Sequence, residues 1–273
     1  MFRNQYDTDI LWSPQGRIHQ VEYAMEAVKQ GSCAVGLTSE DHVVLATLKR
    51  SQSELSSYQR KVFKIDDHLG IAISGLTADG RILCKYMRNE CINYRYVYES
   101  AMPVGRLVRQ VADKSQKCTQ YSWKRPYGVG LLVAGFDKAG PHLFHTCPSG
   151  NFYEYRAFAI GLRSQASRTY LEKKYEEFKG SSVEELIQHG LKSLESSIQD
   201  GELDTNNCSI AVVGKDMPLT VIEGDDLLPH IELLKNADAG VEAGGQEADA
   251  PGEAAAGGGG GGGEQGDVEM AEG

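Results

Sequence analysis

The sequence predicts an α+β fold in which two stacked β-sheets are covered by helices on both outer faces. Three observations lead to this fold class. Short β-rich runs come in antiparallel-type groups joined by polar turns, helical segments are inserted in pairs between these groups, and no internal repeat or phosphate-cradling glycine loop is visible. A repeating βαβ array would instead alternate single strands with single helices. We therefore expect four layers, in the order α, β, β and α.

The chain begins with a predicted arm and turn at residues 1–16, followed by a helix at residues 17–30. Pro14 fixes φ, and Gly16 can adopt the positive φ that a tight reversal often needs. Apolar residues then recur at helical spacing, at Ile18, Val21, Met25 and Val28. This pattern indicates an amphipathic helix. It belongs to a domain predicted to span residues 17–235 and packs on the remainder of that domain.

The body alternates groups of strands with pairs of helices. Runs of β-branched and apolar residues predict strands at 33–38, 43–48, 62–65, 69–76, 128–136, 142–147, 152–160, 208–213 and 219–222. Capping residues and prolines predict helices that begin near Thr77, Pro103, Ser164, Ser182 and either Asp225 or Asp226. The Ser182 helix has a capping box with Glu185, and the last helix is expected to end at Lys235.

Residues 236–273 are expected to form a disordered tail rich in glycine, alanine and acidic residues. This segment contains the glycine run 257–263 and no aromatic, lysine or arginine residue, so it cannot bury enough apolar surface to offset its ordering entropy. Its acids account for nearly all of the net charge of −10, which leaves the body close to neutral. No basic excess suits nucleic acid, and no apolar run is long enough to span a bilayer. We expect an intracellular protein that binds neither nucleic acid nor a membrane.

The cysteines and histidines do not form a recognisable metal site. None of the six cysteines lies in a Cys-x-x-Cys pair, and we expect them to be reduced and packed. His142 and His145 are three residues apart in a predicted strand, so their side chains should point to opposite faces. No metal and no cofactor are expected.

Several strings of residues together resemble the alpha-ring subunits of the 20S proteasome. One group comprises Tyr6 and Asp7, the string WSPQGR at 12–17 and the string VEYAMEAV at 21–28. The others are GSCAVG at 31–36, ISGLTAD at 73–79, RPYGVG at 125–130 and IGLRSQ at 160–165. The resemblance covers residues 1–235. It implies the αββα sandwich of the N-terminal nucleophile hydrolases, with an extra N-terminal helix.

The same resemblance implies a chain without catalytic residues. It places Ser32 where catalytic beta subunits carry a threonine whose free terminal amine acts as the base. Ser32 follows an arm and a helix, so its nitrogen is an amide and is not basic. Leu48 occupies the position of the supporting aspartate, and Lys61 alone matches the supporting lysine. We expect a non-catalytic subunit of a threonine-type endopeptidase complex.

The resemblance also implies a pocket that binds regulators and a gate. Lys61 corresponds to the lysine at the base of a pocket between neighbouring subunits, where the C-terminal carboxylate of a regulator docks. Gly31 and Leu76 correspond to the walls of that pocket. A solvated surface lysine is the alternative interpretation of Lys61. The residues that resemble the cluster holding an open gate are Tyr6, Asp7, Pro14 and Tyr23.

These expectations describe a structural and gating subunit of an outer hetero-heptameric alpha ring, located in the cytoplasm and nucleus. It would control the entry of unfolded polypeptides in ubiquitin-dependent degradation. Its partners would be other alpha subunits, beta-ring subunits and the C-termini of regulatory particles. Two other hypotheses remain: a self-processing amidohydrolase, which requires cleavage before Ser32, and a binding module recruited through its acidic tail.

Overall fold

A computed structural model describes residues 10–51, 53, 55–199 and 201–244, and the statements below concern these residues. The chain divides into two compact units, residues 1–236 and residues 237–273. Within the second unit only the end of the last helix is described. The fold and all the sites discussed below belong to the first unit.

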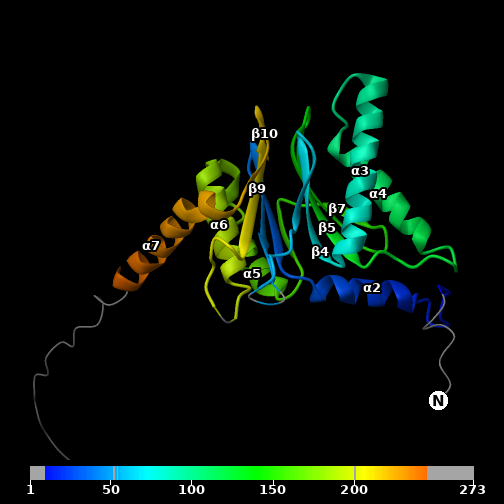
Figure 1. The fold of residues 1–273 in the computed structure, drawn as a ribbon, viewed down its shortest axis with the longest axis horizontal. Helices are drawn as coiled ribbons and strands as arrows, with labels where there is room; N and C mark the ends of the chain where they lie inside the picture. The colour runs from blue at the N-terminus through cyan, green and yellow to red at the C-terminus, as the bar shows by residue number, and fades with distance from the viewer. Residues whose placement is uncertain (1–9, 52, 54, 200, 245–273) are drawn as a thin grey trace, which may run out of the picture. The chain divides into compact units, whose positions relative to one another are not determined.

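The centre of the first unit consists of two five-stranded antiparallel sheets (Figure 1). Sheet A has the strand order β10 (Met217–Ile222), β9 (Cys208–Gly214), β2 (His42–Leu48), β1 (Ala34–Thr38) and β8 (Ala157–Ile160). Sheet B has the order β3 (Val62–Asp66), β4 (Leu69–Gly75), β5 (Val129–Asp137), β6 (Gly140–Thr146) and β7 (Phe152–Glu154). Both sheets are built mainly from neighbouring hairpins, as the paired strand runs in the sequence predict.

Helices cover the outer face of each sheet, and three buried apolar clusters separate the layers. Sheet A packs against α5 (Ser164–Lys174), α6 (Val183–Glu195) and the first turns of α7 (Leu228–Gly244). Sheet B packs against α3 (Thr77–Tyr98) and α4 (Val104–Cys118). The third cluster lies between the two sheets. The predicted αββα sandwich, with its extra N-terminal helix, is confirmed (Figure 1).

The extra helix, α2 (His19–Gln30), contacts β4 and β5. Its buried residues are Val21, Ala24 and Val28, whereas Met25, which the sequence pattern placed in the apolar stripe, is exposed. Gly130 of β5 allows the close approach of this helix, because a Cβ atom there would lie 2.8 Å from Cγ1 of Val28. Helix and sheet are therefore in direct contact.

The single strand expected at residues 152–160 is wrong: the structure has two strands that belong to different sheets. β7 pairs with β6 in sheet B, and β8 pairs with β1 in sheet A. The change of partner occurs at Tyr155, whose N–H donates to Leu143 O, and at Arg156, whose carbonyl accepts from Thr38 N. Residue periodicity reports only that a segment is extended, and it carries no information about which sheet the segment joins.

The C-terminal part of the body also differs from expectation. Asp225 and Asp226 do not cap a helix, because they lie in the short 3₁₀ turn η2 (Gly224–Leu227), and α7 begins after that turn. Helix α7 continues past Lys235 to Gly244, into the segment predicted to be disordered. The remainder of that predicted tail, residues 245–273, lies outside the described residues.

Two other local predictions are confirmed. Ser182 Oγ accepts a hydrogen bond from Glu185 N at 3.3 Å, and the Glu185 carboxylate accepts one from Ser182 N at 2.8 Å, which completes the capping box of α6. The six cysteines are free thiols, and all but Cys147 are buried. In the described part of the chain, no helix combines the length and the apolar composition needed to cross a bilayer.

Candidate functional site

The turn before α2 has the conformation that Pro14 and Gly16 predict. Gly16 has φ of +74°, and its N–H donates to the carbonyl of Ser13 at 2.9 Å. Ser13 Oγ also accepts from Arg17 N, which closes the turn. Of the proposed gate residues, Pro14 lies exposed in this turn and Tyr23 lies half exposed on α2. Tyr6 and Asp7 lie outside the described residues.

A buried serine ties the end of α2 to the start of β1. Ser74 Oγ, in β4, lies 2.9 Å from Val28 O and 3.1 Å from Ser32 O, and both carbonyls accept from it. Gly31 lies between these two carbonyls, and a Cβ atom there would be only 2.2 Å from Gly75 N. The sequence analysis quoted the string that contains Ser74 but gave this residue no role. The sequence alone predicts little about Ser74, because the role of a serine in an apolar strand depends on its hydrogen-bond partners, which the sequence does not show.

Ser32, which the resemblance aligns with a catalytic threonine, is buried, and its nitrogen is not a free amine. Its nitrogen is the peptide amide that follows Gly31, and its side chain is 2% exposed. Ser32 Oγ has no hydrogen-bond partner among the described residues. Leu48 lies beside the start of β1, where its N–H donates to Cys33 O at 3.0 Å. The position next to the serine thus carries an aliphatic side chain that neither accepts a proton nor orients a lysine.

Lys61 is buried at the start of β3. Only 3% of its surface is exposed, and its ammonium has no hydrogen-bond or ion-pair partner within the described ranges. Its carbonyl accepts from Ile73 N at 3.0 Å, which places it beside β4. Burial, and secondarily the charge of Arg50, lower the pKa of this lysine from its ordinary value. The side chain of Lys61 is therefore largely buried and not fully solvated as a surface lysine would be.

Gly31 and Leu76 lie near the same end of β4. Gly31 packs against Gly75, and Leu76 follows directly, with its N–H donating to Gly128 O at 2.8 Å. The side chain of Leu76 is half exposed. The structure thus places a close backbone approach, a half-exposed apolar side chain and a buried lysine around one strand end.

A charged pair anchors the loop between α4 and β5 to the first turn of α3. Both terminal nitrogens of Arg125 donate to the carboxylate of Asp79, at 2.6 and 2.8 Å, and Gly128 N donates to the same carboxylate at 2.9 Å. The Arg125 guanidinium holds the pKa of Asp79 below its usual range. These residues occur in two of the quoted strings, but the sequence analysis did not predict that they meet.

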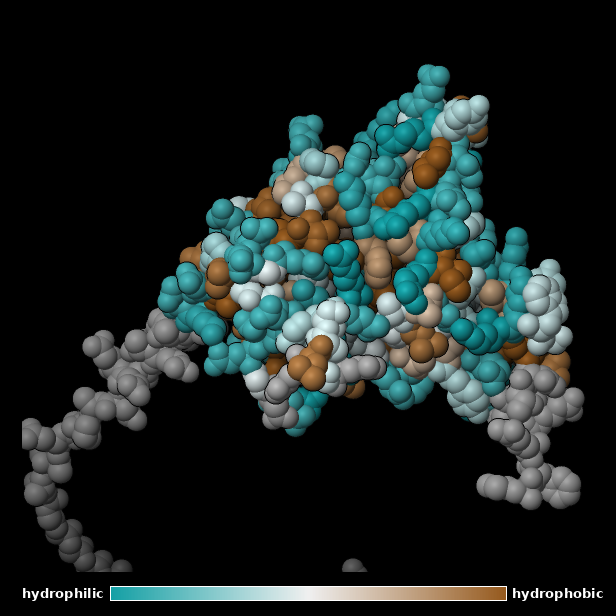
Figure 2. Space-filling model, in the orientation of Figure 1, coloured by the Kyte–Doolittle hydropathy of each residue, from teal (hydrophilic) through white to brown (hydrophobic). Residues whose placement is uncertain are grey.

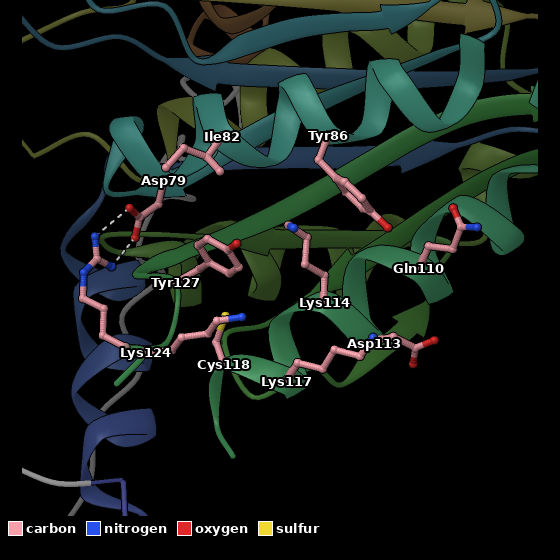
Figure 3. A pocket seen from close by; sticks show the side chains of 11 residues that line it. Asp79, Ile82, Tyr86, Gln110, Asp113, Lys114, Lys117, Cys118, Lys124 and Tyr127 are labelled. Carbon is pink, nitrogen blue, oxygen red and sulfur yellow. Dashed lines mark hydrogen bonds and ion pairs between the residues drawn. The ribbon is translucent and has the colours of Figure 1, made fainter. Parts of the chain in front are cut away.

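The anchored loop closes one side of a pocket of about 570 Å³ between α3 and α4 (Figure 3). Its polar lining includes Tyr86, Gln110, Lys114, Lys117, Lys124 and Tyr127. The sequence analysis missed this pocket. Lys114 and Lys117 are three apart in a helical segment, which is a detectable signal, but Lys124 joins them only through the fold of the loop.

The two histidines of β6 have separate environments. His142 lies between two carboxylates, with Nδ1 2.5 Å from Glu154 and Nε2 3.1 Å from Asp137. His145 contacts the rings of Tyr155 and Phe158, and burial lowers its pKa to about 4. No group of three or more potential metal ligands is found among the residues that the structure describes.

Comparison with known proteins gives the family. Residues 28–213 match the family model described as "Proteasome subunit", and residues 6–27 match the model for the N-terminal signature of A-type proteasome subunits. A protein of Dictyostelium discoideum named "Proteasome subunit alpha type-1" is 59% identical over 86% of this chain and 96% of its own length. The Drosophila melanogaster protein of the same name is 49% identical over 87% of each chain.

A protein of Schizosaccharomyces pombe named "Probable proteasome subunit alpha type-6" is 50% identical over 86% of this chain and 87% of its own length. The opening residues 1–7 and the acidic tail of this sequence resemble the alpha type-1 subunit at the sixth alpha position, and two of these three names agree with that resemblance. Both family models match, and the named relatives are 49–59% identical over most of the chain. The chain therefore belongs to the proteasome subunit family, within its alpha branch.

Proposed function

We propose that this alpha subunit is a non-catalytic wall and gate of the 20S core. It would assemble into the outer hetero-heptameric alpha ring against the beta ring, and its N-terminal arm would restrict the entry of unfolded polypeptides. Regulator C-termini would dock beside Lys61 and bias the arm between ordered and disordered states. The protein would act in the cytoplasm and nucleus, in ubiquitin-dependent degradation.

The absence of a catalytic base supports the non-catalytic part of this proposal. Ser32 is internal, buried and preceded by α2, and Leu48 takes the place of a carboxylate. The competing hypothesis of self-processing requires a mature chain that begins at Ser32. Intact-mass measurement of the chain from purified core particles is expected to give the unprocessed mass. A species that begins at Ser32 and hydrolyses peptides without beta subunits would refute the proposal.

Lys61 carries the docking part, because the residue is 3% exposed and its ammonium has no hydrogen-bond or ion-pair partner among the described residues. A buried charge without a counter-ion is costly, and an incoming carboxylate would provide the missing partner. Gly31 keeps the neighbouring backbone close, and the half-exposed Leu76 offers apolar contact to a peptide side chain. A free C-terminal carboxylate next to an apolar residue therefore suits the end of β4.

The docking proposal is tested with Lys61→Ala in assembled core particles. Hydrogen bonds to charged groups contribute about 1.5–3 kcal/mol, so a regulator C-terminal peptide should bind this position roughly 10- to 150-fold more weakly. Lys64→Ala is the matched control, because Lys64 lies on the same strand with its side chain exposed and paired with Asp67. Equal peptide affinity for the two variants would exclude a docking role for Lys61. Affinity is the better readout, since other pockets can sustain stimulated hydrolysis.

Exposed apolar side chains on α3 support assembly with other subunits. The end of this helix projects beyond the sheets (Figure 1) and carries hydrophobic residues among hydrophilic ones (Figure 2). Those most exposed are Ile92, Tyr96, Val97 and Tyr98. Apolar surface grouped in this way is typical of an interface between chains. Native mass spectrometry of the endogenous complex should find the chain in rings with six other alpha subunits, and a free monomer as its main form would contradict the proposal.

A further inference from the structure

The lining of the pocket between α3 and α4 has more lysine ammonium groups than carboxylates to neutralise them. Lys114, Lys117 and Lys124 line it, and none has a carboxylate within ion-pair distance in the described part of the chain. The carboxylate of Asp79 is occupied by Arg125 and by Gly128 N. Asp113 is the remaining carboxylate of the lining. The unneutralised charge of the lining is therefore positive.

Aromatic rings hold two of these ammonium groups in place without neutralising them. Lys114 Nζ lies 4.5 Å from the centroid of the Tyr86 ring, and Lys124 Nζ lies 4.6 Å from that of Trp123. Cation–π contacts of this kind restrict the position of a lysine but leave its charge available to a ligand. Figure 3 shows Lys114 and Gln110 of α4 extending into the space below Tyr86 of α3.

The other polar groups of the lining are mostly hydrogen-bond donors. Burial, and then the carboxylates of Glu90 and Asp113, raise the pKa of Tyr86; burial, and then Cys118, raise that of Tyr127 to about 12. Both phenols stay protonated and are hydrogen-bond donors. Gln110 adds a side-chain amide. Its Oε1 is buried without a hydrogen-bond partner among the residues described, and it is not accessible to a molecule in the pocket.

We propose that this pocket binds a compact anion that carries two or more phosphate groups. The phosphates would pair with the three lysines and accept from the phenols. Each phosphate ester brings up to two negative charges and three acceptor oxygens into a small volume. An acidic peptide fits less well, because same-side carboxylates along an extended chain lie roughly 7 Å apart and carry one charge each.

The pocket is held open by the fold itself, which distinguishes it from a chance group of surface lysines. The Asp79–Arg125 pair fixes the loop that carries Lys124 to the start of α3, while Lys114 and Lys117 lie on α4. Lys114 and Lys124 are both partly buried. A site that is already formed binds without the entropic cost of ordering a loop.

The proposal is tested by titrating inositol 1,4,5-trisphosphate into assembled core particles that contain the full chain, with calorimetry as the readout. The pocket variant replaces Lys114, Lys117 and Lys124 by glutamine. The control variant makes the same charge change at the exposed residues Lys138, Lys173 and Lys215. Charge-assisted contacts are lost only in the first variant, so its affinity should fall at least about tenfold, against less than about twofold in the control.

Two further arms identify the ligand class. Inorganic tripolyphosphate should compete with the trisphosphate for the wild-type pocket and should lose affinity in the pocket variant as the trisphosphate does. An octaglutamate peptide that binds more tightly than the trisphosphate would replace the proposal with an acidic-peptide site. The proposed site would be excluded if the pocket and control variants lost equal affinity for the trisphosphate, or if the wild type did not bind it. If the triple variant fails to assemble, Lys114→Gln against Lys138→Gln gives the same comparison.

Discussion

Lys61→Met should raise the stability of this chain and, at the same time, weaken the docking proposed for this site. Lys61 is 3% exposed, and its ammonium has no partner among the described residues. Methionine is similar in length and has no charge to desolvate. Leaving a buried polar group unpaired costs about 1–3 kcal/mol, more for a charge, so removing the ammonium should increase the free energy of unfolding by about 1–2 kcal/mol. In a domain of this size that gain raises the Tm by roughly 2–8 °C.

The assay is thermal unfolding of the full-length chain, with Lys138→Met as the control at an exposed position. The control should change the Tm little, since a solvated lysine bears no desolvation cost. Regulator affinity is measured for the same two variants, so that an effect on stability can be distinguished from an effect on docking. Only Lys61→Met is expected to combine a higher Tm with weaker binding.

The pH dependence gives a second and independent check. The pKa of Lys61 in the folded chain is lowered by burial, so the unfolded chain binds more protons between the folded and the ordinary pKa, and stability rises with pH in that window. The cost of the ammonium is complete below the folded pKa and is relieved as pH increases through it. The advantage of Lys61→Met should therefore narrow in alkaline solution. A Tm no higher than that of the wild type, or an advantage that widens with pH, would refute the reasoning and remove the main support for docking.

Three other substitutions test the junctions described above. Gly31→Ala would place a Cβ atom 2.2 Å from Gly75 N and should cost about 2–3 kcal/mol in chemical denaturation, whereas Gly180→Ala, which meets no atom within 4 Å, should cost far less. Asp79→Asn should cost about 1–3 kcal/mol near neutral pH. The pKa of Asp79 is depressed in the folded chain, so its stabilising contribution is complete above its ordinary pKa and is lost as pH falls through the folded pKa. The difference in unfolding free energy between Asp79→Asn and the wild type should therefore shrink in acid. Ser182→Ala removes the capping box of α6 and should cost about 1 kcal/mol, and no change in denaturation midpoint would show that the cap contributes nothing.

Periodicity and turn chemistry predicted the layers and most of the elements, because these depend on local preferences. The capping box at Ser182 and the turn at Gly16 are examples, since each is specified by residues a few positions apart. The switch of sheets at Tyr155 was not predicted. It depends on hydrogen bonds to β6 on one side and to β1 on the other, and neither partner is visible from the segment itself.

The candidate site was also predictable only in part. The resemblance pointed to Lys61, Gly31 and Leu76 by their positions in the sequence, but the burial of Lys61 and its lack of partners are visible only in the fold. Ser74 and the basic pocket were missed, because each brings together segments that are far apart in the sequence. Ser74 Oγ bonds carbonyls more than 40 residues earlier in the chain, and Lys124 lines the pocket from a loop that the Arg125–Asp79 pair ties to α3.

The placement of α2 bears on the proposed lack of catalysis. The helix directly precedes Ser32, so the amine that a catalytic relative would use is part of a peptide bond, and Ser74 ties the flanking carbonyls, Val28 O and Ser32 O, to β4. Release of α2 would break the hydrogen bond from Ser74 to Val28 O but not the one to Ser32 O, which lies outside the helix. It would still leave Leu48 where a carboxylate is needed, so a free amine alone would not restore the reaction. Neither the free amine nor the carboxylate of a catalytic relative has a counterpart at the corresponding positions, which supports the proposed non-catalytic role, and the helix that covers the Ser32 nitrogen also packs on β4 and β5.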